Sequence, residues 1–537
     1  MPGDDQEGVP VAPIHPMRAA HPLIFEINTW PWLAALSAHH GRPVGLGDVP
    51  AADWDAIAAL GFDTVWLMGV WERSPAGVAI ALANDGLMED FRATLADFTP
   101  DDVVGSPYCV RRYVVDEHLG GPEGLAAARA ALAERGVSLV LDFVPNHVAP
   151  DHPWTRTHPE YFVAGTADDL ERDPAAFVAV GDRVLANGKD PYFAAWPDVV
   201  QLDAFSPALR AAAIDTLVEI GAQCDGVRCD MAMLMMNATF ARTWGDRVGP
   251  APTDDFWPTV IPAVRRTHPA FTFIAEAYWD LEWGLQRQHF DYCYDKRLYD
   301  RLVAAVDGTG DAEAVRGHLH ADLDYQRGLL RFVENHDEPR AAATFPAEAE
   351  RAAVVAALSQ TGARLVHQGQ ATGRRAHLPV FLGRFPDEPL DADLQAFHTR
   401  LLAALSDDTF REGNWQLCDV GGWPGDDSWA GLVSWCWSGD ARWLVVVNLS
   451  AVTATGHVAV PWADVHGREW RLTDPTHPDP NDAAGTTSFD RDGDDLADGM
   501  FVSLPPWQWH FCRVDPLPDP PADQSPTHAN PADPETP

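Results

Sequence analysis

The chain has 537 residues, of which 46% are hydrophobic and 22% are charged. This is the composition of a globular protein with a large core, and it excludes a disordered or fibrous chain. Acidic residues outnumber basic ones by 79 to 38, so the formal net charge is −41. A surface this negative repels phosphate backbones and anionic lipids, so neither nucleic acid nor a membrane is expected as a partner.

The seven cysteines are scattered along the chain and never form a Cys-x-x-Cys pair. Their pattern therefore indicates neither a zinc site nor a disulfide framework, and reduced thiols are the simplest interpretation. Residues 1–22 contain no apolar core of a signal peptide, and no later segment is apolar for long enough to span a bilayer. We expect a cytoplasmic protein, and its oligomeric state is left open.

From Leu23 onward, short β-branched or aromatic runs alternate with alanine-rich amphipathic stretches. This alternation is typical of parallel strands that are joined by helices. Strands are predicted at 23–30, 62–70, 137–144, 226–230, 271–276, 290–294, 329–333 and 363–367. The clearest helices are predicted at 54–60, 124–135, 207–221 and 347–360. Eight such strands favour a closed (β/α)8 TIM barrel, with an open doubly wound sheet as the alternative.

The barrel is expected to comprise residues 22–147 and 206–405, after a flexible N-terminus at 1–21. Residues 148–205 are rich in Pro, Asp and aromatic residues, and the segment is too long for a simple loop between a strand and a helix. We therefore expect an inserted domain after the third strand. Residues 72–107, after the second strand, also interrupt the repeat.

Beyond residue 405 the pattern changes to short strands that are separated by Gly, Asp and Pro. This predicts a C-terminal antiparallel β-sandwich domain at 406–514, followed by a disordered, Pro- and Asp-rich tail at 515–537. Its tryptophans stand at alternating strand positions, which favours packing in the core over a platform for carbohydrate. They are Trp435, Trp437, Trp443, Trp462, Trp470, Trp507 and Trp509.

Polar residues follow the apolar strands at the point where each strand ends. Asp142 and His147 close the third strand, and three further strands end at Asp230, Glu276 and Asp337. Burying an unpaired charge costs several kcal/mol, on the order of 3–5, so a merely structural barrel would avoid this arrangement. A barrel brings the carboxyl ends of its strands together around its axis, so these side chains are expected on one rim.

Paired carboxylates of this kind serve glycoside hydrolysis, in which one attacks the anomeric carbon and the other protonates the leaving oxygen. Arg228 and Asp230 stand two residues apart, hence on one strand face, where the guanidinium would keep the aspartate ionised. Glu276 follows an apolar run that would desolvate it and favour its protonated form.

Two other kinds of site compete for the same residues. A metal site made of His147, Asp230, Glu276 and Asp337 is compatible with the residue types, although the order of the strands favours the sugar chemistry. A Ser-His-Asp hydrolase is disfavoured, because the chain has no Gly-x-Ser-x-Gly elbow.

Four strand-end segments resemble the four short sequence regions of the α-amylase superfamily of glycoside hydrolases, in the same order. They are Asp142-Phe-Val-Pro-Asn-His147, Gly226-Val-Arg-Cys-Asp230, Ile274-Ala-Glu276 and Phe332-Val-Glu-Asn-His-Asp337. The resemblance spans roughly residues 22–405, and the segment at 148–205 stands where that family inserts its domain B.

The resemblance implies that Asp230 is the nucleophile, Glu276 the general acid/base and Asp337 the stabiliser of the transition state. It also implies a sugar-binding pocket around these three residues, with Asp142 as a buried orienting carboxylate. Tyr113 is a possible substitute for Tyr108 in stacking beneath the sugar, and Tyr278 with Trp279 offers further aromatic faces. The expected pocket residues are Arg228, His147, His336, Tyr108, Asp142 and Tyr278.

The sequence departs from the family pattern after the nucleophile. Many members have a Lys-His pair there, whereas this chain has Met233 and Leu234. Asn146 matches the asparagine that usually binds calcium in the family, and the Leu234 carbonyl could be a second ligand. No cofactor is expected to be required, and calcium is a possible ligand.

We therefore predict a retaining glycoside hydrolase that acts on α-glucans or malto-oligosaccharides through a covalent intermediate. The alternatives are a glucanotransferase, a sucrose- or trehalose-type glucosyl-transferring enzyme, a phosphorolytic enzyme, and an inactive carbohydrate-binding barrel. Phosphorolysis would need a basic acceptor pocket. Arg374 and Arg375 are expected on the same rim, where they either contact an anionic acceptor or, as we favour, neutralise neighbouring acids.

Overall fold

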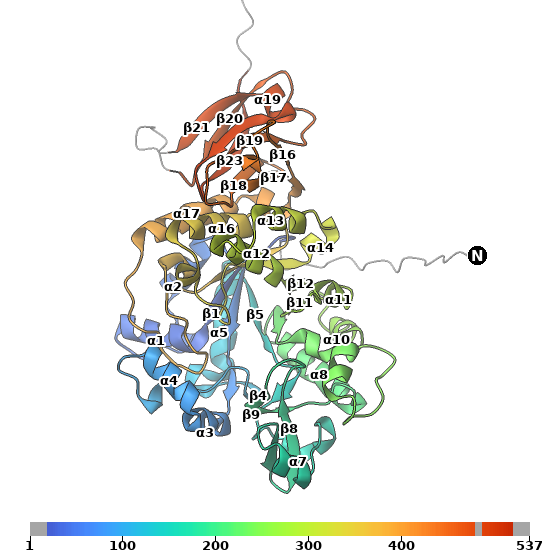
Figure 1. Ribbon diagram of the computed structural model, residues 1–537. Coiled ribbons are helices and arrows are strands. Elements are labelled where there is room, and N and C mark those ends of the chain that lie inside the picture. The colour runs from blue at the N-terminus through green and yellow to red at the C-terminus, as the bar shows by residue number, and fades with distance from the viewer. Residues whose placement is uncertain (1–18, 478–485, 519–537) are drawn as a thin grey trace, which may run out of the picture.

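The structure is a computed structural model that describes residues 19–477 and 486–518. Eight parallel strands close into a barrel at its centre, which confirms the predicted TIM barrel (Figure 1). Each of the eight predicted runs supplies one barrel strand. They are β1 (Leu23–Asn28), β2 (Thr64–Met68), β5 (Ser138–Phe143), β10 (Gly226–Cys229), β11 (Thr272–Ala275), β12 (Tyr292–Tyr294), β13 (Leu329–Arg331) and β14 (Ala363–His367).

The strands are buried on both faces, so alternate residues enter two different clusters. Ile24 and Trp66 belong to a cluster with Leu330, whereas Leu67 and Leu141 pack with residues of the surrounding helices. This burial on both sides explains why the strands are continuously apolar in sequence rather than alternating.

Helices follow the strands and surround the barrel, and several begin at a side-chain cap. Ser206, Asp295 and Asp391 each accept a hydrogen bond from the third residue of the helix that follows. The principal helices are α1 (Thr29–His40), α2 (Ala51–Ala59), α5 (Gly121–Glu134), α8 (Pro207–Gly221), α10 (Phe256–Arg265), α12 (Lys296–Asp307), α16 (Ala347–Leu358) and α17 (Ala392–Leu405). Shorter helices are α9 (Asn237–Trp244), α11 (Glu282–Gln286), α13 (Ala312–Leu319), α14 (Leu323–Arg327), α15 (Ala341–Thr344) and α18 (Asp408–Glu412).

Two excursions interrupt the barrel at the predicted places. An antiparallel sheet in the order β6-β9-β8-β7 lies between β5 and β10. It comprises β6 (His147–Val148), β7 (Phe177–Val180), β8 (Arg183–Gly188) and β9 (Trp196–Gln201), with α6 (Trp154–Thr157) and α7 (Ala167–Arg172). The other excursion, after β2, pairs β3 (Trp71–Arg73) with β4 (Val110–Val115), and α3 (Pro75–Ala83) and α4 (Asp85–Thr94) lie between them in sequence.

The C-terminal region forms two antiparallel sheets that share one core cluster, as predicted for a sandwich. The larger has the order β15-β17-β18-β23-β20-β21 and the smaller β16-β19-β22. Their strands are β15 (Asn414–Leu417), β16 (Asp419–Gly421), β17 (Leu432–Ser438), β18 (Arg442–Asn448), β19 (Ala454–Ala459), β20 (Glu469–Asp474), β21 (Thr487–Asp492), β22 (Met500–Leu504) and β23 (Trp509–Pro516). The helix α19 (Gly493–Asp498) precedes β22.

The larger sheet also packs on the barrel. Trp435 and Trp437 join the cluster of the barrel helices, and both indole N–H groups donate to the Ser359 carbonyl, over 3.1 and 2.8 Å. Cys436, between them, faces the sandwich core instead. Of the seven tryptophans named in the sequence analysis, six are buried and Trp507 is half-buried, which confirms that these seven pack in the core.

The folded region extends further at both ends than the sequence predicted. His21 is buried and its backbone N–H donates to the Arg411 carbonyl, so residues 19–21 are not a flexible leader. At the other end β23 continues to Pro516, because Asp515 and Pro516 pair with Arg471 and Trp470 of β20. Residues 1–18 of the predicted N-terminus and 519–537 of the predicted tail lie outside the described residues. Within the described part, no helix combines the length and apolarity that crossing a bilayer demands.

Candidate active site

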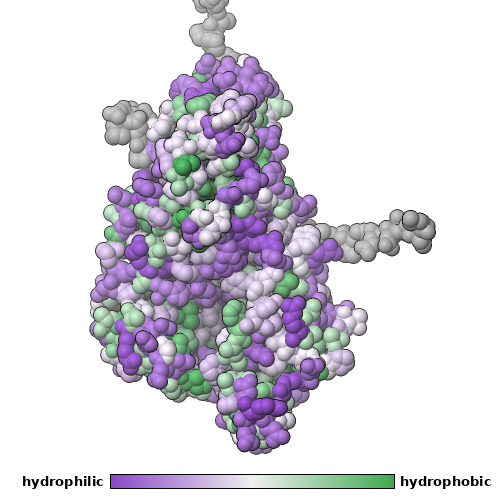
Figure 2. Space-filling model, viewed as in Figure 1, coloured by the Kyte–Doolittle hydropathy of each residue, from purple (hydrophilic) through white to green (hydrophobic). Residues whose placement is uncertain are grey.

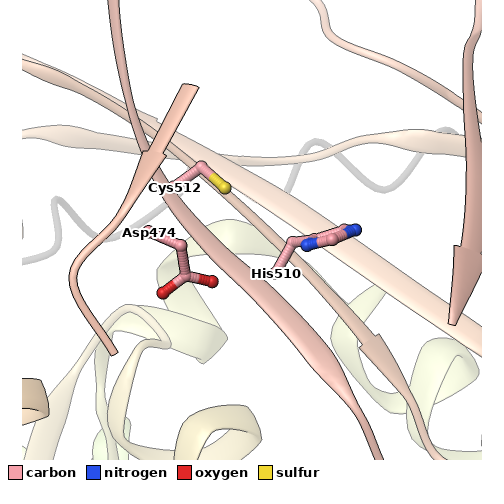
Figure 3. Close-up of side chains that lie close together, drawn as sticks. All are labelled: Asp474, His510 and Cys512. Atoms are coloured by element: carbon pink, nitrogen blue, oxygen red, sulfur yellow. The ribbon is translucent and has the colours of Figure 1, made fainter. Parts of the chain in front are cut away.

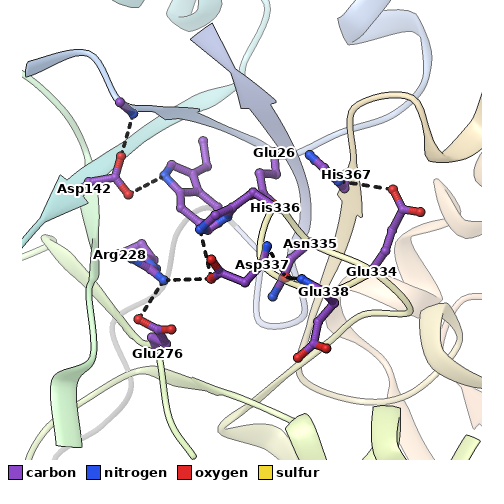
Figure 4. Close-up of polar contacts among 12 residues, drawn as sticks. Glu26, Asp142, Arg228, Glu276, Glu334, Asn335, His336, Asp337, Glu338 and His367 are labelled. Carbon is purple, nitrogen blue, oxygen red and sulfur yellow. Dashed lines mark hydrogen bonds and ion pairs between the residues drawn. The ribbon is translucent and has the colours of Figure 1, made fainter. Parts of the chain in front are cut away.

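The three predicted strand-end carboxylates meet around one buried arginine. Figure 4 shows two of them, Glu276 and Asp337, beside Arg228. The Arg228 side chain is 1% exposed, and its Nη1 lies 2.8 Å from Asp230 Oδ1. Its Nη2 lies 2.7 Å from Glu276 Oε2 and 3.7 Å from Asp337 Oδ2. One guanidinium thus neutralises part of the repulsion among three acids that converge from three strands.

The register of the barrel strands produces this convergence. Cys229 of β10 pairs with Ala275 of β11, so the residues that follow, Asp230 and Glu276, are neighbours across the two strands. The Glu276 N–H donates to the Cys229 carbonyl over 3.1 Å, and the Asp230 N–H donates to the Phe143 carbonyl of β5 over 2.8 Å. Both acids are therefore held by the backbone as the strands end.

The surroundings of Glu276 favour its protonated form. It is 4% exposed, and burial raises its pKa to about 7, against the opposing effect of Arg228 and with support from the charges of Asp230 and Asp337. Its Oε2 also accepts the Met231 N–H over 2.5 Å, which orients the carboxyl group. A carboxyl group with this pKa exchanges its proton near neutral pH, as a general acid/base must.

Asp337 has the opposite environment. Burial alone would raise its pKa, but the ion pair with His336, 3.0 Å from Nε2 to Oδ2, lowers it to about 2. Its side chain keeps 38% of its surface exposed. Asp337 is thus an ionised carboxylate that faces open space on the rim.

His336 is kept protonated by two carboxylates. Burial opposes its charge, yet Asp337 and Glu26 raise its pKa to about 10. Its Nδ1 donates to Glu26 Oε1 over 2.5 Å, and Nε2 lies 2.6 Å from Tyr108 Oη. The imidazolium connects the fully buried Glu26 of β1 to the rim.

Tyr108, rather than Tyr113, lies in the predicted pocket. Its ring is stacked against His336 with centroids 5.5 Å apart, and Arg228 lies 5.1 Å from the ring centroid. Tyr113 instead exchanges hydrogen bonds of 3.0 Å with the backbone of Val144, which occupies its hydroxyl group.

Asp142 is fully buried beneath the rim, and hydrogen bonds to both oxygens fix the orientation of its carboxylate. Its Oδ2 accepts the Gly69 N–H over 2.8 Å, and its Oδ1 accepts the Trp66 indole N–H over 3.2 Å. Burial raises its pKa to about 6, although the nearby Arg228 and the Gly69 hydrogen bond oppose the rise. It is paired in register with Arg228 and therefore lies beside the arginine that gathers the rim acids.

The other predicted pocket residues lie at the same rim. Burial lowers the pKa of His147, which favours a neutral ring, although the nearby Asp230 charge opposes this. The His147 ring packs against Trp196 with centroids 5.2 Å apart. Tyr278 is half-buried, and burial with the Glu276 and Asp337 charges raises the pKa of its hydroxyl group.

Asn146, the residue predicted to bind calcium, has its oxygens engaged by the side-chain amide of Gln201. Asn146 Oδ1 and its backbone oxygen each accept a hydrogen bond of 2.9 Å from Gln201 Nε2, and the backbone oxygen also accepts the Leu202 N–H. Calcium requires free oxygen ligands, preferably carboxylates. These oxygens already receive N–H donors, so the donor set fits calcium poorly.

One other cluster of metal-ligating types occurs among the described residues, in the C-terminal region. Asp474, His510 and Cys512 place ligand atoms within 4.8 Å of one another (Figure 3). The Asp474 carboxylate, however, accepts hydrogen bonds from Thr476, His477 and the Phe511 N–H, and burial raises the pKa of the Cys512 thiol. Since the carboxylate is already satisfied and the thiol is held protonated, this cluster is explained by packing of the sheet.

Sequence reasoning missed two supports of the site. Glu26 stands inside an apolar run and is fully buried. A charged residue in a buried strand needs a partner of opposite charge, and this feature of the sequence could have predicted one. Tyr294 ends β12, and its hydroxyl oxygen accepts the Arg228 Nε–H over 3.2 Å.

A second buried network of polar contacts holds the loop that carries Asp337 in place. The sequence did not predict this network either. Glu334 Oε2 accepts the Ala341 N–H over 2.6 Å, and its Oε1 pairs with Arg340 and His367 over 3.0 and 3.2 Å. Asn335 Oδ1 accepts the N–H groups of Asp337 and Glu338, both over 2.9 Å. The loop between β13 and α15 is therefore held at its base and at its tip.

Comparison with known proteins gives distant relatives that share the barrel. No family model matches the chain. It is 26% identical over 363 residues to the α-amylase MalA of Haloarcula japonica, covering 66% of this chain and 44% of that protein. It is 24% identical over 253 residues to an α-1,4-glucan:maltose-1-phosphate maltosyltransferase of Corynebacterium pseudotuberculosis, covering 44% of this chain and 30% of that one. The chain thus matches less than half the length of these curated relatives.

Solved structures match over almost the whole chain and show its fold. The maltogenic α-amylase AmyB of Thermotoga neapolitana is 19% identical with a TM-score of 0.64, covering 93% of this chain and 99% of that one. The cyclic α-maltosyl-(1→6)-maltose hydrolase of Arthrobacter globiformis is 18% identical with a TM-score of 0.61, covering 93% and 100%. The chain is thus similar in sequence to an α-amylase and to maltosyltransferases, and it has the fold of the solved α-amylases, a barrel with an inserted sheet.

Proposed function

We propose that the protein is a retaining enzyme that acts on the α-glucosidic bonds of α-glucans or malto-oligosaccharides. The observation that carries the proposal is the pairing of Asp230 and Glu276 on one guanidinium. Arg228 Nη1 lies 2.8 Å from Asp230 Oδ1, while burial raises the pKa of Glu276 to about 7. A nucleophile and a proton donor therefore stand side by side, which is the requirement of a double displacement.

In the first step a carboxylate oxygen of Asp230 attacks the anomeric carbon and the glycosidic C–O bond breaks. Glu276 transfers its proton to the leaving oxygen, so the first product departs as a neutral alcohol. The glycosyl group remains as an ester of Asp230. In the second step the Glu276 carboxylate accepts a proton from water or a sugar hydroxyl, which attacks the anomeric carbon and releases Asp230.

The surrounding residues stabilise the positive charge that develops on the sugar ring. Asp337 stays ionised because its pKa is about 2, and it offers a fixed negative charge to an oxocarbenium-like transition state. Tyr108 provides an aromatic face for the sugar, and His147, His336 and Tyr278 provide polar groups for its hydroxyls.

Water and a sugar hydroxyl are both suitable acceptors at this site, whereas phosphate is disfavoured. Arg374 Nη1 lies 3.4 Å from Glu388 Oε2, and the Arg375 N–H donates to Glu388 Oε1 over 2.8 Å. Lys296 pairs with Asp300 and Glu338. In the part of the chain that the structure describes, Arg374 and Lys296 are thus paired with carboxylates, which argues against the basic pocket that phosphorolysis needs.

Incubation with maltoheptaose, with and without glucose as an acceptor, tests this proposal. Shorter products alone indicate hydrolysis, and products longer than the substrate indicate transfer. Asp230→Asn removes the nucleophile and is expected to lower turnover by at least ~10³-fold. Asp419→Asn changes an exposed aspartate of β16 and is the matched control, with no expected effect. Full turnover by Asp230→Asn, or intact maltoheptaose with the wild type, contradicts the proposal.

A further inference from the structure

Lys296 stands at a position that local preferences disfavour. It is the first residue of α12, and the first turn of that helix contains no acidic residue. A cation in the first turn opposes the helix macrodipole. Lysine is also scarce in this chain, where Lys189 is the only other one. A residue that conflicts with its local setting in this way is expected to serve a tertiary contact.

The Lys296 ammonium group reaches the loop that carries Asp337. Its Nζ lies 3.1 Å from Oε1 of Glu338, the residue directly after Asp337. Two further contacts orient the ammonium group. The Asp300 Oδ1 lies 2.5 Å from Nζ, and the centroid of the Tyr299 ring lies 4.6 Å from it. Lys296 therefore approaches Glu338 from a fixed direction.

The backbone that carries Lys296 is fixed as well. Asp295, directly before it, is buried and pairs with Arg331 of β13. The Asp295 N–H also donates to the Leu330 carbonyl of β13 over 2.9 Å. The strand β13 leads into the loop of the rim. The end of β12 is thus joined to β13 beneath the rim by Asp295, and to the loop at the rim by Lys296.

Glu338 transmits this contact to the catalytic rim. Figure 4 shows it next to Asn335, whose Oδ1 accepts the backbone N–H groups of Asp337 and Glu338, both over 2.9 Å. The Glu338 side chain is 13% exposed. Without Lys296 its carboxylate would be buried without a cation, and the loop would have to move to return it to water. Because one amide oxygen holds both residues, that movement displaces Asp337.

Repulsion among acids makes the cation necessary at this place. Acidic residues outnumber basic ones by 79 to 38, and Figure 2 shows hydrophilic residues spread over the face that it displays. Burial and the charges of Asp300 and Asp337 raise the pKa of Glu338, and Lys296 opposes the rise. Since Lys296 contacts both Asp300 and Glu338, it offsets the repulsion between α12 and the loop.

We propose that Lys296 is a positioning residue for Asp337, which it holds at the rim through its ion pair with Glu338. The inference rests on the proposed function and deepens it, because it gives the end of β12 a part in the geometry of the site. Lys296 acts through Glu338 and not on the sugar itself. Displacement of Asp337 weakens stabilisation of the transition state more than binding of the substrate, so the loss is expected in kcat.

Kinetics of Lys296→Met on maltoheptaose test this inference. The variant is expected to lower kcat by roughly tenfold and to change KM by less than about twofold. Lys296→Arg keeps the positive charge and is expected to retain at least about half of kcat. The matched control is Lys189→Met, because Lys189 also lies 4.6 Å from an aromatic centroid, that of Trp244, but follows β8 of the inserted segment. Unchanged kcat in Lys296→Met overturns the inference, and so does an equal loss in Lys189→Met.

Glu338→Gln is the second variant, since it keeps the shape of the side chain and removes the charge that Lys296 binds. Alone it is expected to lower kcat by about threefold, less than Lys296→Met, because it leaves no carboxylate buried without a cation. Added to Lys296→Met, it is expected to restore part of kcat for the same reason. A lysine that only stabilises the fold would lower the melting temperature without this recovery. Additive losses in the double variant contradict the positioning role.

Thermal unfolding of each variant separates misplacement of Asp337 from loss of folding. If Lys296→Met does not fold, Glu338→Gln decides the matter, and unchanged kcat in that variant overturns the inference. Turnover of maltoheptaose and of a short chromogenic maltoside by the wild type tests the proposed function on its own. Active wild type with no effect of the variants on kcat refutes only the role of Lys296, whereas an inactive wild type refutes the proposed function.

Discussion

Glu276 and Asp337 share a rim and an arginine, yet their neighbours drive their pKa values in opposite directions. Burial beside two other acids raises the pKa of Glu276 to about 7. The protonated His336, which also forms a hydrogen bond with Glu26, lowers the pKa of Asp337 to about 2. Around neutral pH Glu276 therefore exchanges a proton while Asp337 stays ionised, so the proton is available on the residue that must donate it.

This arrangement predicts the alkaline limb of the pH profile. The first chemical step requires protonated Glu276, so kcat/KM is expected to fall by about tenfold per pH unit as the pH rises above about 7. Measurement of kcat/KM for a malto-oligosaccharide across the range checks this. Glu276→Gln should lose this limb together with most of its activity toward poor leaving groups. A flat profile above pH 7 in the wild type would show that another group supplies the proton.

Much of the site was predictable residue by residue, but its supports were not. Arg228 and Asp230 stand two apart on a strand, so their shared face follows from the period of the strand. Glu26 is 310 residues from His336 in sequence. No local pattern relates them, since only closure of the barrel brings β1 beside β14 and its neighbours.

At the scale of elements, the register between β10 and β11 decides where Asp230 and Glu276 meet. Gly226 begins this pairing opposite Thr272. A Cβ at Gly226 would lie 2.8 Å from the Thr272 carbonyl oxygen, closer than backbone atoms allow. The glycine therefore permits the close approach that sets the register.

Gly226→Ala is expected to destabilise the protein by about 1–3 kcal/mol and to lower kcat, because the two strands must separate or shift. Unfolding in denaturant and kinetics on maltoheptaose measure both effects. Gly317→Ala provides the control, because Gly317 lies within α13 and no atom stands within 4 Å of its added Cβ. That variant should be stabilised by up to about 1 kcal/mol. Equal effects of the two substitutions would argue against a role for the close approach.

Element boundaries departed from the predictions where tertiary contacts extend or end a segment. The first strand was predicted to run to residue 30, but helix α1 begins at Thr29 directly after β1. At the C-terminus, the Pro- and Asp-rich composition indicated disorder from 515, yet pairing with β20 carries β23 to Pro516. A proline is tolerated at the end of a strand, where its missing N–H leaves no ladder bond unmade.

At the scale of the whole molecule, the C-terminal sandwich and the barrel share a hydrophobic core. Trp435 and Trp437 contribute two fully buried indoles to it, and both donate to the carbonyl of Ser359, the residue after α16. Such an interface couples the unfolding of the two parts, because separating them would expose both rings and leave the indole N–H groups unsatisfied.

Trp437→Ala is therefore expected to lower the free energy of unfolding by about 3–5 kcal/mol. Calorimetry should show the transition of the wild type as one peak, and the variant as a peak at lower temperature or as two peaks. Trp423→Ala, at an exposed tryptophan of the same region, should leave the transition within a few degrees of the wild type. A similar decrease in both variants would show that the shared core does not couple the two parts.

The sequence by itself determined the number and order of the barrel strands, the inserted and C-terminal regions, and the strand-end residues of the rim. These are local properties, because hydrophobic periodicity and the position of a charge at the end of an apolar run are visible within a few residues. Only the tertiary structure decided which charges neutralise one another. Glu26 forms an ion pair with His336, and Glu388 forms one with Arg374. Glu334 accepts a hydrogen bond from the Ala341 N–H and so holds the loop that carries Asp337. Such pairings depend on distances between segments far apart in the chain, and burial strengthens them in a way that composition does not record.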